Sequence, residues 1–172
     1  PKSQAPNPAL HAHTRPALEP AEARALTAYS SAEYANINKF LRGQPSEDPE
    51  YERQLHDSLQ SAFAKAAPLP EPVAVYRVMQ LSGNEDDERE RFLADLTRAQ
   101  SGGGTVRMAG YTSTTTDRGF VDMMTTGAGA QDTVVEIAAH KGLDVKPYSK
   151  KPHERELLLD HDTAFSVLDY RT

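Results

Sequence analysis

The apolar residues of this chain change their period once, and that change restricts the fold more than any other feature of the sequence. From residue 20 to residue 66 they recur at helical spacing, so that Leu55, Leu59 and Phe63 form one stripe. Beyond Pro72, short β-branched and aromatic segments alternate with glycine, proline and polar residues, which is typical of strands. Helices first and closely spaced strands afterwards predict an α+β domain with antiparallel sheets.

Local signals set the bounds of the predicted elements. Gly43 ends the second of two short helices, and the pair Ser30 and Ser31 separates them as a break that can cap. The predicted helices occupy 20–43, divided by that break, 48–66 and 84–104. The predicted strands occupy 73–79, 106–115, 133–139, 143–147, 156–160 and 163–171.

The length of the chain indicates one domain. Its 172 residues are enough for a substantial core and too few for two ordinary domains. Residues 1–19 carry four prolines among small and polar residues, a composition that disfavours both helix and strand. We therefore expect a flexible Pro-rich tail or linker over 1–19 and a single domain over 20–172.

The composition argues against several classes of protein. A formal charge of -6 disfavours a nucleic-acid binder, because contacts to phosphates need a clustered excess of Lys and Arg. The low mean hydropathy predicts no membrane-spanning segment. The chain has no cysteine, and no two histidines have the spacing of a helical zinc motif, so we expect no metal site.

Three features in or beside the predicted strands have polar side chains that could bind a ligand or take part in catalysis. Arg77 lies inside the apolar segment 73–79, where an unpaired guanidinium is costly to bury, so it should meet an anion or a carboxylate. The run 112–116 presents successive hydroxyl side chains, either as ordinary strand residues or as hydrogen-bond partners for a polar ligand. Glu154 and Glu156 precede an apolar run, and in an extended segment they would share one face, as a solvated edge or as functional carboxylates.

The order of these features resembles that of a known family. An arginine in a "VYR" strand, a "TSTT" strand and a Glu-x-Glu before an apolar strand are similar to the bacterial mono-ADP-ribosyltransferases of the arginine-serine-glutamate class. The resemblance runs from about Tyr29 to the C-terminus and implies N-terminal helices packed on two antiparallel sheets with a central NAD cleft. In the helical part it rests on Tyr29, Tyr34, Ile37, Asn38, Leu41 and Arg42.

The resemblance implies a role for each polar position. Glu156 would be the catalytic carboxylate, stabilising the positive charge that develops on the ribose as nicotinamide leaves. Ser113 would orient Glu156 and contact the ribose, while Arg77, with Arg42, would bind the pyrophosphate. Glu154 would hold the acceptor arginine and help to remove its proton.

Four further residues would complete the NAD site by the same resemblance. Tyr34 and Asn38 lie four residues apart on one helical face and would line the nicotinamide pocket. Thr114 and Thr115 occupy the second and third positions of the family's Ser-Thr-Ser strand and would also contact the NAD. The resemblance implies no metal.

The implied function is transfer of ADP-ribose from NAD to an arginine of a target protein, by a monomeric bacterial effector that is secreted and acts in the host cytoplasm. We expect neither a nucleic-acid nor a membrane partner. Two other functions stay open. Val78 follows Arg77 at a position where the family commonly has glycine, and the larger valine side chain can narrow the NAD site. The domain would then be a module that only binds a protein or peptide arginine. Alternatively, the domain is an NAD glycohydrolase, in which water replaces the arginine.

Overall fold

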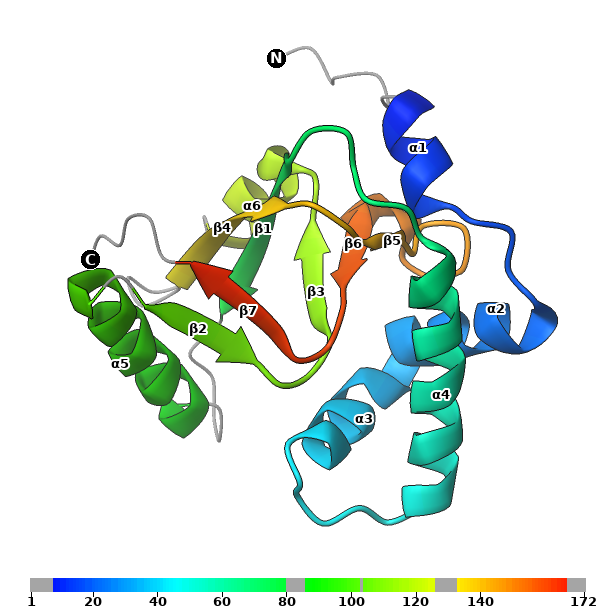
Figure 1. Ribbon diagram of the computed structural model, residues 1–172, viewed down its shortest axis with the longest axis horizontal. Helices are drawn as coiled ribbons and strands as arrows, with labels where there is room; N and C mark the ends of the chain where they lie inside the picture. Colours follow the sequence, from blue (N-terminus) through cyan, green and yellow to red (C-terminus); the bar gives the residue numbers. More distant parts are fainter. Residues whose placement is uncertain (1–7, 80–85, 103, 126–132, 167–172) are drawn as a thin grey trace.

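The computed structural model describes residues 8–79, 86–102, 104–125 and 133–166 (Figure 1). The helices are α1 (Pro8–Thr14), α2 (Pro20–Ala28), α3 (Tyr34–Leu41), α4 (Pro49–Lys65), α5 (Asp86–Gly102) and α6 (Arg118–Thr125), with a π-helical turn η1 (Tyr29–Glu33) and a 3-10 turn η2 (Pro152–Glu154). The strands are β1 (Val73–Met79), β2 (Thr105–Met108), β3 (Thr112–Thr115), β4 (Thr133–Ala139), β5 (Leu143–Asp144), β6 (Glu156–Leu159) and β7 (Thr163–Ser166).

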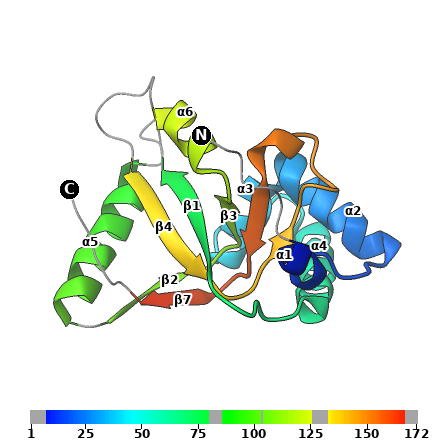
Figure 2. The ribbon, with the colours of Figure 1, turned by 90° about the horizontal axis from the view of Figure 1, so that it is seen from above.

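Two antiparallel sheets form the centre of the domain. The larger one has five strands in the order β4-β1-β3-β6-β5, and the smaller one pairs β2 with β7. Helices α2, α3 and α4 lie on the β5–β6 side of the larger sheet, whereas α5 lies along β2 on the opposite side (Figures 1 and 2). The predicted α+β fold is confirmed, and β1 and β4 have the bounds expected from the sequence.

The core consists of two main clusters that share strand β6. The first joins α2, α3 and α4 to β5 and β6, and it includes Tyr29, Leu59 and Leu158. The second lies on the larger sheet, where Leu157 packs with residues of β1 and β4 and with Phe165 of β7. Because neighbouring leucines of β6 enter different clusters, the strand is buried on both faces and its register is fixed.

Part of the predicted tail is folded. Helix α1 begins at Pro8, where the missing N–H of proline has no cost because the first helical turn leaves that group unpaired. Beyond the helix, Arg15 donates from Nε to Asp144 of β5 at 2.8 Å. The prediction of a flexible tail is therefore wrong for 8–15, because docking against β5 outweighs the local effect of the prolines. Residues 1–7 lie outside the described residues.

The predicted break at Ser30 and Ser31 is a π-helical turn rather than a cap. Both serine hydroxyls donate to the carbonyl of Thr27, at 3.1 and 2.6 Å, so they bond back into the helix. The side chain of Tyr29, the first residue of the turn, is almost completely buried. Single π-helical turns are frequent at functional sites, and this one directs Tyr29 towards β3.

The segment 106–115 contains two strands, not the single strand predicted. β2 belongs to the smaller sheet and β3 to the larger one, and the chain turns between them at Gly110. A Cβ at Gly110 would come within 2.6 Å of the Asn38 side-chain oxygen, so this close approach requires glycine. Strand β5 is also shorter than the predicted 143–147. The predicted strand 163–171 begins as β7, and its last residues lie outside the described part of the chain.

A buried carboxylate joins α2 to α4. Glu22 accepts hydrogen bonds from Lys65 Nζ at 2.8 Å and from Ser61 Oγ at 2.6 Å. These bonds, with that from Lys65 the strongest, lower the pKa of Glu22 from 4.5 to about 2. A carboxyl with a lowered pKa stabilises the folded state above its unfolded pKa, and this contribution is lost as the pH falls through the folded value.

We expect Glu22→Gln to lower the free energy of unfolding by about 2 kcal/mol at pH 7, because the charge-assisted bonds weaken. The difference from the unmodified protein should narrow as the pH falls from 4.5 to about 2. Urea unfolding at several pH values, followed by circular dichroism, measures this difference. Glu50→Gln, on an exposed part of α4, is the control. A difference that stays constant with pH would show that Glu22 acts through packing alone.

Candidate active site

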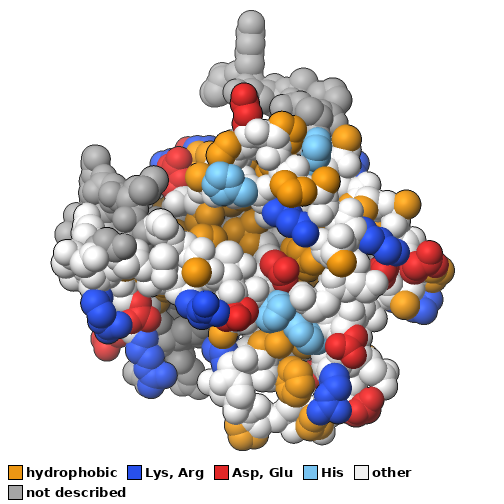
Figure 3. Space-filling view, in the orientation of Figure 1, with side chains coloured by type: hydrophobic (Ala, Val, Ile, Leu, Met, Phe, Trp, Pro, Cys, Tyr) orange, Lys and Arg blue, Asp and Glu red, His pale blue; other side chains and the backbone are white. Residues whose placement is uncertain are grey.

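Three strands that are distant in the sequence bring the predicted functional residues together. Strand β3 lies between β1 and β6, and the register places Thr115 opposite both Tyr76 and Glu156. Arg77 of β1, Ser113 of β3 and Glu156 of β6 thereby come from neighbouring strands. Figure 3 shows the molecule hollowed between the larger sheet and the β2–β7 pair, with hydrophobic side chains on the floor of the hollow.

Glu156, the first residue of β6, is half-buried. Burial raises the pKa of its carboxyl, and the charge of Glu154 raises it further. A hydrogen bond with the Ser113 side chain and the charge of Arg77 act in the opposite direction. The structure thus brings Ser113, Glu156 and Arg77 close enough to interact. A partly desolvated carboxylate in this setting can stabilise a developing positive charge.

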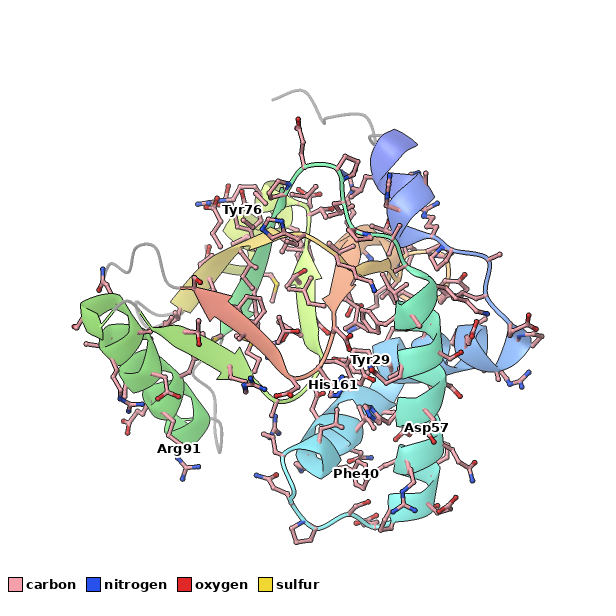
Figure 4. All side chains as sticks on the ribbon, in the orientation of Figure 1. Tyr29, Phe40, Asp57, Tyr76, Arg91 and His161 are labelled. Atoms are coloured by element: carbon pink, nitrogen blue, oxygen red, sulfur yellow. The ribbon has the colours of Figure 1, made fainter. Side chains whose placement is uncertain are left out.

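Tyr29 supports Ser113 from the helical side of the sheet. Its hydroxyl lies 3.4 Å from Ser113 Oγ and accepts a hydrogen bond from Asn38 Nδ2 at 3.3 Å. Burial raises the pKa of Tyr29, which keeps the phenol neutral. Figure 4 shows Tyr29 where the helices meet the strands. Hydrogen bonds thus connect α3 to Glu156 through Tyr29 and Ser113, a role for Tyr29 that no pattern in the sequence indicated.

Asn38 binds the backbone ahead of β3. Its Nδ2 donates to the carbonyl of Tyr111 at 3.1 Å, and its Oδ1 accepts from the Tyr111 amide at 2.8 Å. Tyr34 is 53% exposed, with its ring edge-on to that of Tyr29. Arg42 is exposed at the end of α3. Contact of Asn38, Tyr34 or Arg42 with NAD stays a prediction, and Asn38 already has a positioning role.

The hydroxyls of Thr114 and Thr115 are used by the backbone of the neighbouring segment. Thr114 Oγ1 donates to the carbonyl of Leu157 at 2.6 Å, and Thr115 Oγ1 donates to the carbonyl of Glu154 at 2.6 Å. Both threonines are buried. The observed contacts therefore place these hydroxyls as partners of β6 and of the turn before it, and contact of either threonine with NAD stays a prediction.

Glu154 and Glu156 were expected to share one extended segment, but they do not. Glu154 ends the 3-10 turn η2, and Arg155 has φ 46 and ψ 49, in the left-handed region. The strand begins only at Glu156. The two carboxylates are still close enough for Glu154 to raise the pKa of Glu156. The predicted proximity is therefore observed, but a turn produces it.

Arg77 is half-buried and has an unsatisfied donor. One of its terminal nitrogens donates to the carbonyl of Ser113 at 3.4 Å, which is a long hydrogen bond. Its buried Nε has no hydrogen-bond partner within the described residues. Because buried polar groups are normally satisfied, this nitrogen favours an anionic ligand beside β1.

A second polar cluster, with no motif in the sequence, lies where α4 meets the turn before β3. His56 Nδ1 is 2.9 Å from the hydroxyl of Tyr111, and Gln60 Nε2 donates to that hydroxyl at 3.0 Å and to Asp160 Oδ1 at 2.8 Å. The ring of His161 stands edge-on to that of His56, with 4.6 Å between the ring centroids. Burial, and then the charge of His161, lower the pKa of His56.

Over the described ranges, no three histidine or acidic side chains are arranged to hold a metal ion. Over the same ranges, every helix is too short or too polar to cross a membrane.

Comparison with known sequences finds relatives of this chain. A model of the ADP-ribosyltransferase exoenzyme family matches residues 9–172. The chain is 30% identical over 148 residues to Exoenzyme T of Pseudomonas aeruginosa. That similarity covers 86% of this chain and 29% of Exoenzyme T, so the chain spans less than a third of the length of this relative.

Solved structures of low sequence identity share the fold. Vis, an ADP-ribosyltransferase toxin of Vibrio splendidus solved in complex with agmatine, has a TM-score of 0.68 at 17% identity, over 95% of this chain and 75% of Vis. Exoenzyme S of Pseudomonas aeruginosa, in complex with human 14-3-3 protein beta and bound to carba-NAD, has a TM-score of 0.63 at 21% identity, over 86% of this chain and 64% of that one. The match to the family model over nearly the whole sequence, together with this shared fold, shows that the chain belongs to the ADP-ribosyltransferase exoenzyme family.

Proposed function

We propose that this domain is a mono-ADP-ribosyltransferase that moves ADP-ribose from NAD to an arginine of a target protein. The observation that carries the proposal is the environment of Glu156, a half-buried carboxyl with a raised pKa that lies close to Ser113 and Arg77. A second carboxylate, Glu154, lies next to it. Membership of the exoenzyme family supports the same reaction class.

NAD is the proposed substrate, and the chain has groups that suit it. The unsatisfied Nε of Arg77 needs an acceptor, which a pyrophosphate oxygen would supply by a charge-assisted hydrogen bond. Arg42 is a second proposed pyrophosphate contact. Ser113 would contact the ribose while it holds Glu156. The carba-NAD bound to Exoenzyme S supports NAD as the donor.

The proposed reaction exchanges one bond at the ribose for another. The bond between the nicotinamide nitrogen and C1′ breaks, nicotinamide leaves with the bonding electrons, and a guanidinium nitrogen of the acceptor forms a bond to C1′. The carboxylate of Glu156 stabilises the positive charge on the ribose between these events. The proton lost by the guanidinium passes to Glu154 or to water, which balances the transfer.

Glu154 is the reason to propose arginine as the acceptor. Its side chain is 33% exposed, so a protein acceptor can reach it, and a carboxylate can bind a guanidinium through two parallel hydrogen bonds. The complex of Vis with agmatine, a small guanidinium compound, supports an arginine acceptor for a protein of this fold. We further propose that the domain is part of a secreted bacterial effector that acts as a monomer in the host cytoplasm.

Nicotinamide release from NAD, measured with and without agmatine, tests this function. We expect release to rise with agmatine and an ADP-ribosyl-agmatine product to form. Release without that product would identify an NAD glycohydrolase. If the domain neither releases nicotinamide nor binds NAD, a module that only binds arginine is favoured, with Val78 as the residue that narrows the site.

We expect Arg77→Lys to raise the KM for NAD about tenfold. Lysine keeps the charge but lacks Nε and the planar arrangement of donors, so it would bind a pyrophosphate less well. The control is Arg53→Lys on the exposed surface of α4, which should leave the KM unchanged. A loss of thermal stability with an unchanged KM would instead assign Arg77 to the hydrogen bond with the Ser113 carbonyl.

A further inference from the structure

The residue between the two carboxylates has an unusual backbone conformation. Arg155, with φ 46, and Asp162, with φ 51, are the non-glycine residues of the described ranges that have a positive φ. Arginine has no intrinsic preference for this left-handed region, so surrounding contacts must hold it there. Glu154 precedes Arg155 and Glu156 follows it, so this one backbone conformation determines how the two carboxylates are placed relative to each other.

The end of β3 supplies the contacts that hold the turn. Thr116 donates to the carbonyl of Arg155 from its amide, at 3.2 Å, and from its hydroxyl, at 3.3 Å. Thr115 Oγ1 donates to the carbonyl of Glu154 at 2.6 Å. Three donors from two successive residues thus bind the carbonyls on both sides of the strained position. We call Thr115, Thr116 and Asp117 the β3 clamp.

Asp117 anchors the β3 clamp to helix α6. Its amide donates to Thr115 Oγ1 at 3.0 Å, which orients that hydroxyl towards the turn. Its Oδ1 accepts from the amides of Gly119 and Phe120, at 2.9 and 3.3 Å, and so caps α6. Its Oδ2 lies 3.7 Å from Arg155 Nε. That ion pair is partly exposed and therefore weak, so the backbone bonds do most of the holding.

Glu154 already has a cationic partner on the surface, even with the β3 clamp in place. Lys151 Nζ lies 3.7 Å from Glu154 Oε1, and the lysine side chain is 66% exposed. If the turn relaxed to negative φ, Glu154 would be free to follow this flexible cation away from Glu156. The left-handed turn therefore keeps Glu154 near Glu156 even though Glu154 is paired with Lys151.

We propose that Arg155 is a positioning residue: its left-handed backbone, held by the β3 clamp, keeps Glu154 beside Glu156 and thereby favours transfer to arginine over transfer to water. The inference rests on the proposed function and deepens it, because it concerns how the site selects between two acceptors. Glu156 belongs to strand β6, which pairs with β3 from Glu156 to Leu159. Cleavage of NAD should therefore survive when the turn relaxes.

Two substitutions of Arg155 separate the effect of its backbone conformation from the effect of its side-chain charge. Glycine adopts positive φ readily, whereas valine is strongly disfavoured there, and both remove the guanidinium. We expect Arg155→Gly to keep transfer to agmatine within about twofold, and Arg155→Val to lower it about tenfold with a raised KM for agmatine. Hydrolysis of NAD in the absence of agmatine should stay within about twofold in both variants.

The pH profile of NAD hydrolysis gives a readout that a general loss of structure would not produce. The described charged side chains that act on Glu156 are Glu154, which raises its pKa, and Arg77, which lowers it. If Glu154 moves away in Arg155→Val, the pKa of Glu156 falls and the acid limb of the profile shifts to lower pH. In Arg155→Gly the limb should not shift.

Each outcome of these assays decides the proposal. Equal transfer by the two variants would overturn it, and so would parallel losses of transfer and hydrolysis in Arg155→Val. If the unmodified protein hydrolyses NAD but never modifies agmatine, the proposed arginine transfer itself fails, and this inference fails with it. Thermal unfolding of both variants shows whether the fold is retained. Thr116→Val, compared with Thr116→Ser, repeats the test if Arg155→Val does not fold, with a smaller fall in transfer expected for the valine.

Discussion

Replacement of Glu156 by glutamine is expected to lower both nicotinamide release and transfer to agmatine roughly a thousandfold. Glutamine has nearly the same shape and can still bond Ser113, but it has no negative charge to stabilise the ribose as nicotinamide leaves. Stability at pH 7 should be unchanged or slightly higher. Burial raises the pKa of Glu156, so the ionised form costs folding free energy that the neutral amide does not. Assays of both activities, with thermal unfolding, measure the effect.

The pH dependence of the unmodified protein provides the companion measurement. Because the ionised carboxyl is the active form, nicotinamide release should decline as the pH falls through the raised pKa of Glu156, above the range of an ordinary glutamate. Glu136→Gln, on β4, is the matched control and should keep full activity. A Glu156→Gln protein that is unfolded, or that stays active, would assign Glu156 to the structure of the β6 strand instead.

The sequence was most informative where burial determines the local pattern. The bounds of β1 and β4 were predicted correctly, because each is a run of apolar and β-branched residues that is typical of a strand. Arg77 attracted attention for the same reason, because a charge within such a segment needs an explanation. The interaction between Ser113 and Glu156 was predicted by the resemblance to the family, not by a local pattern.

Other parts of the site depend on contacts that leave no local pattern. No glycine or asparagine marks Arg155 as left-handed, because hydrogen bonds from a distant strand impose that conformation. Tyr29 reaches Ser113 through a π-helical turn whose two serines suggested an ordinary helix end. The bond from the Thr115 hydroxyl to the Glu154 carbonyl was not predicted either, because a hydroxyl on a strand can bond a ligand or the neighbouring backbone equally well. Such assignments require the tertiary structure.

Substitution of Glu154 by glutamine is expected to lower transfer to agmatine roughly a hundredfold while NAD hydrolysis stays within about threefold. An amide cannot accept the proton of the guanidinium, and it cannot form the pair of charge-assisted bonds that a carboxylate offers. Hydrolysis needs only Glu156, which keeps its contacts with Ser113 and Arg77. The rates of transfer to agmatine and of NAD hydrolysis, measured on one protein sample, give the ratio in which ADP-ribose passes to agmatine and to water.

The pKa of Glu156 shows whether Glu154→Gln acts through the lost carboxylate charge or through a general disorder of the site. The charge of Glu154 raises that pKa, so in Glu154→Gln the acid limb of NAD hydrolysis should move to lower pH even though its plateau is almost unchanged. Glu50→Gln, in the exposed first turn of α4, should change neither quantity. Equal losses of transfer and hydrolysis would show that Glu154 serves NAD cleavage as well, and the acceptor would then have to be bound by other residues. An unchanged ratio of transfer to hydrolysis in Glu154→Gln would show that Glu154 takes no part in the reaction. The structural reason to propose arginine as the acceptor would then be lost.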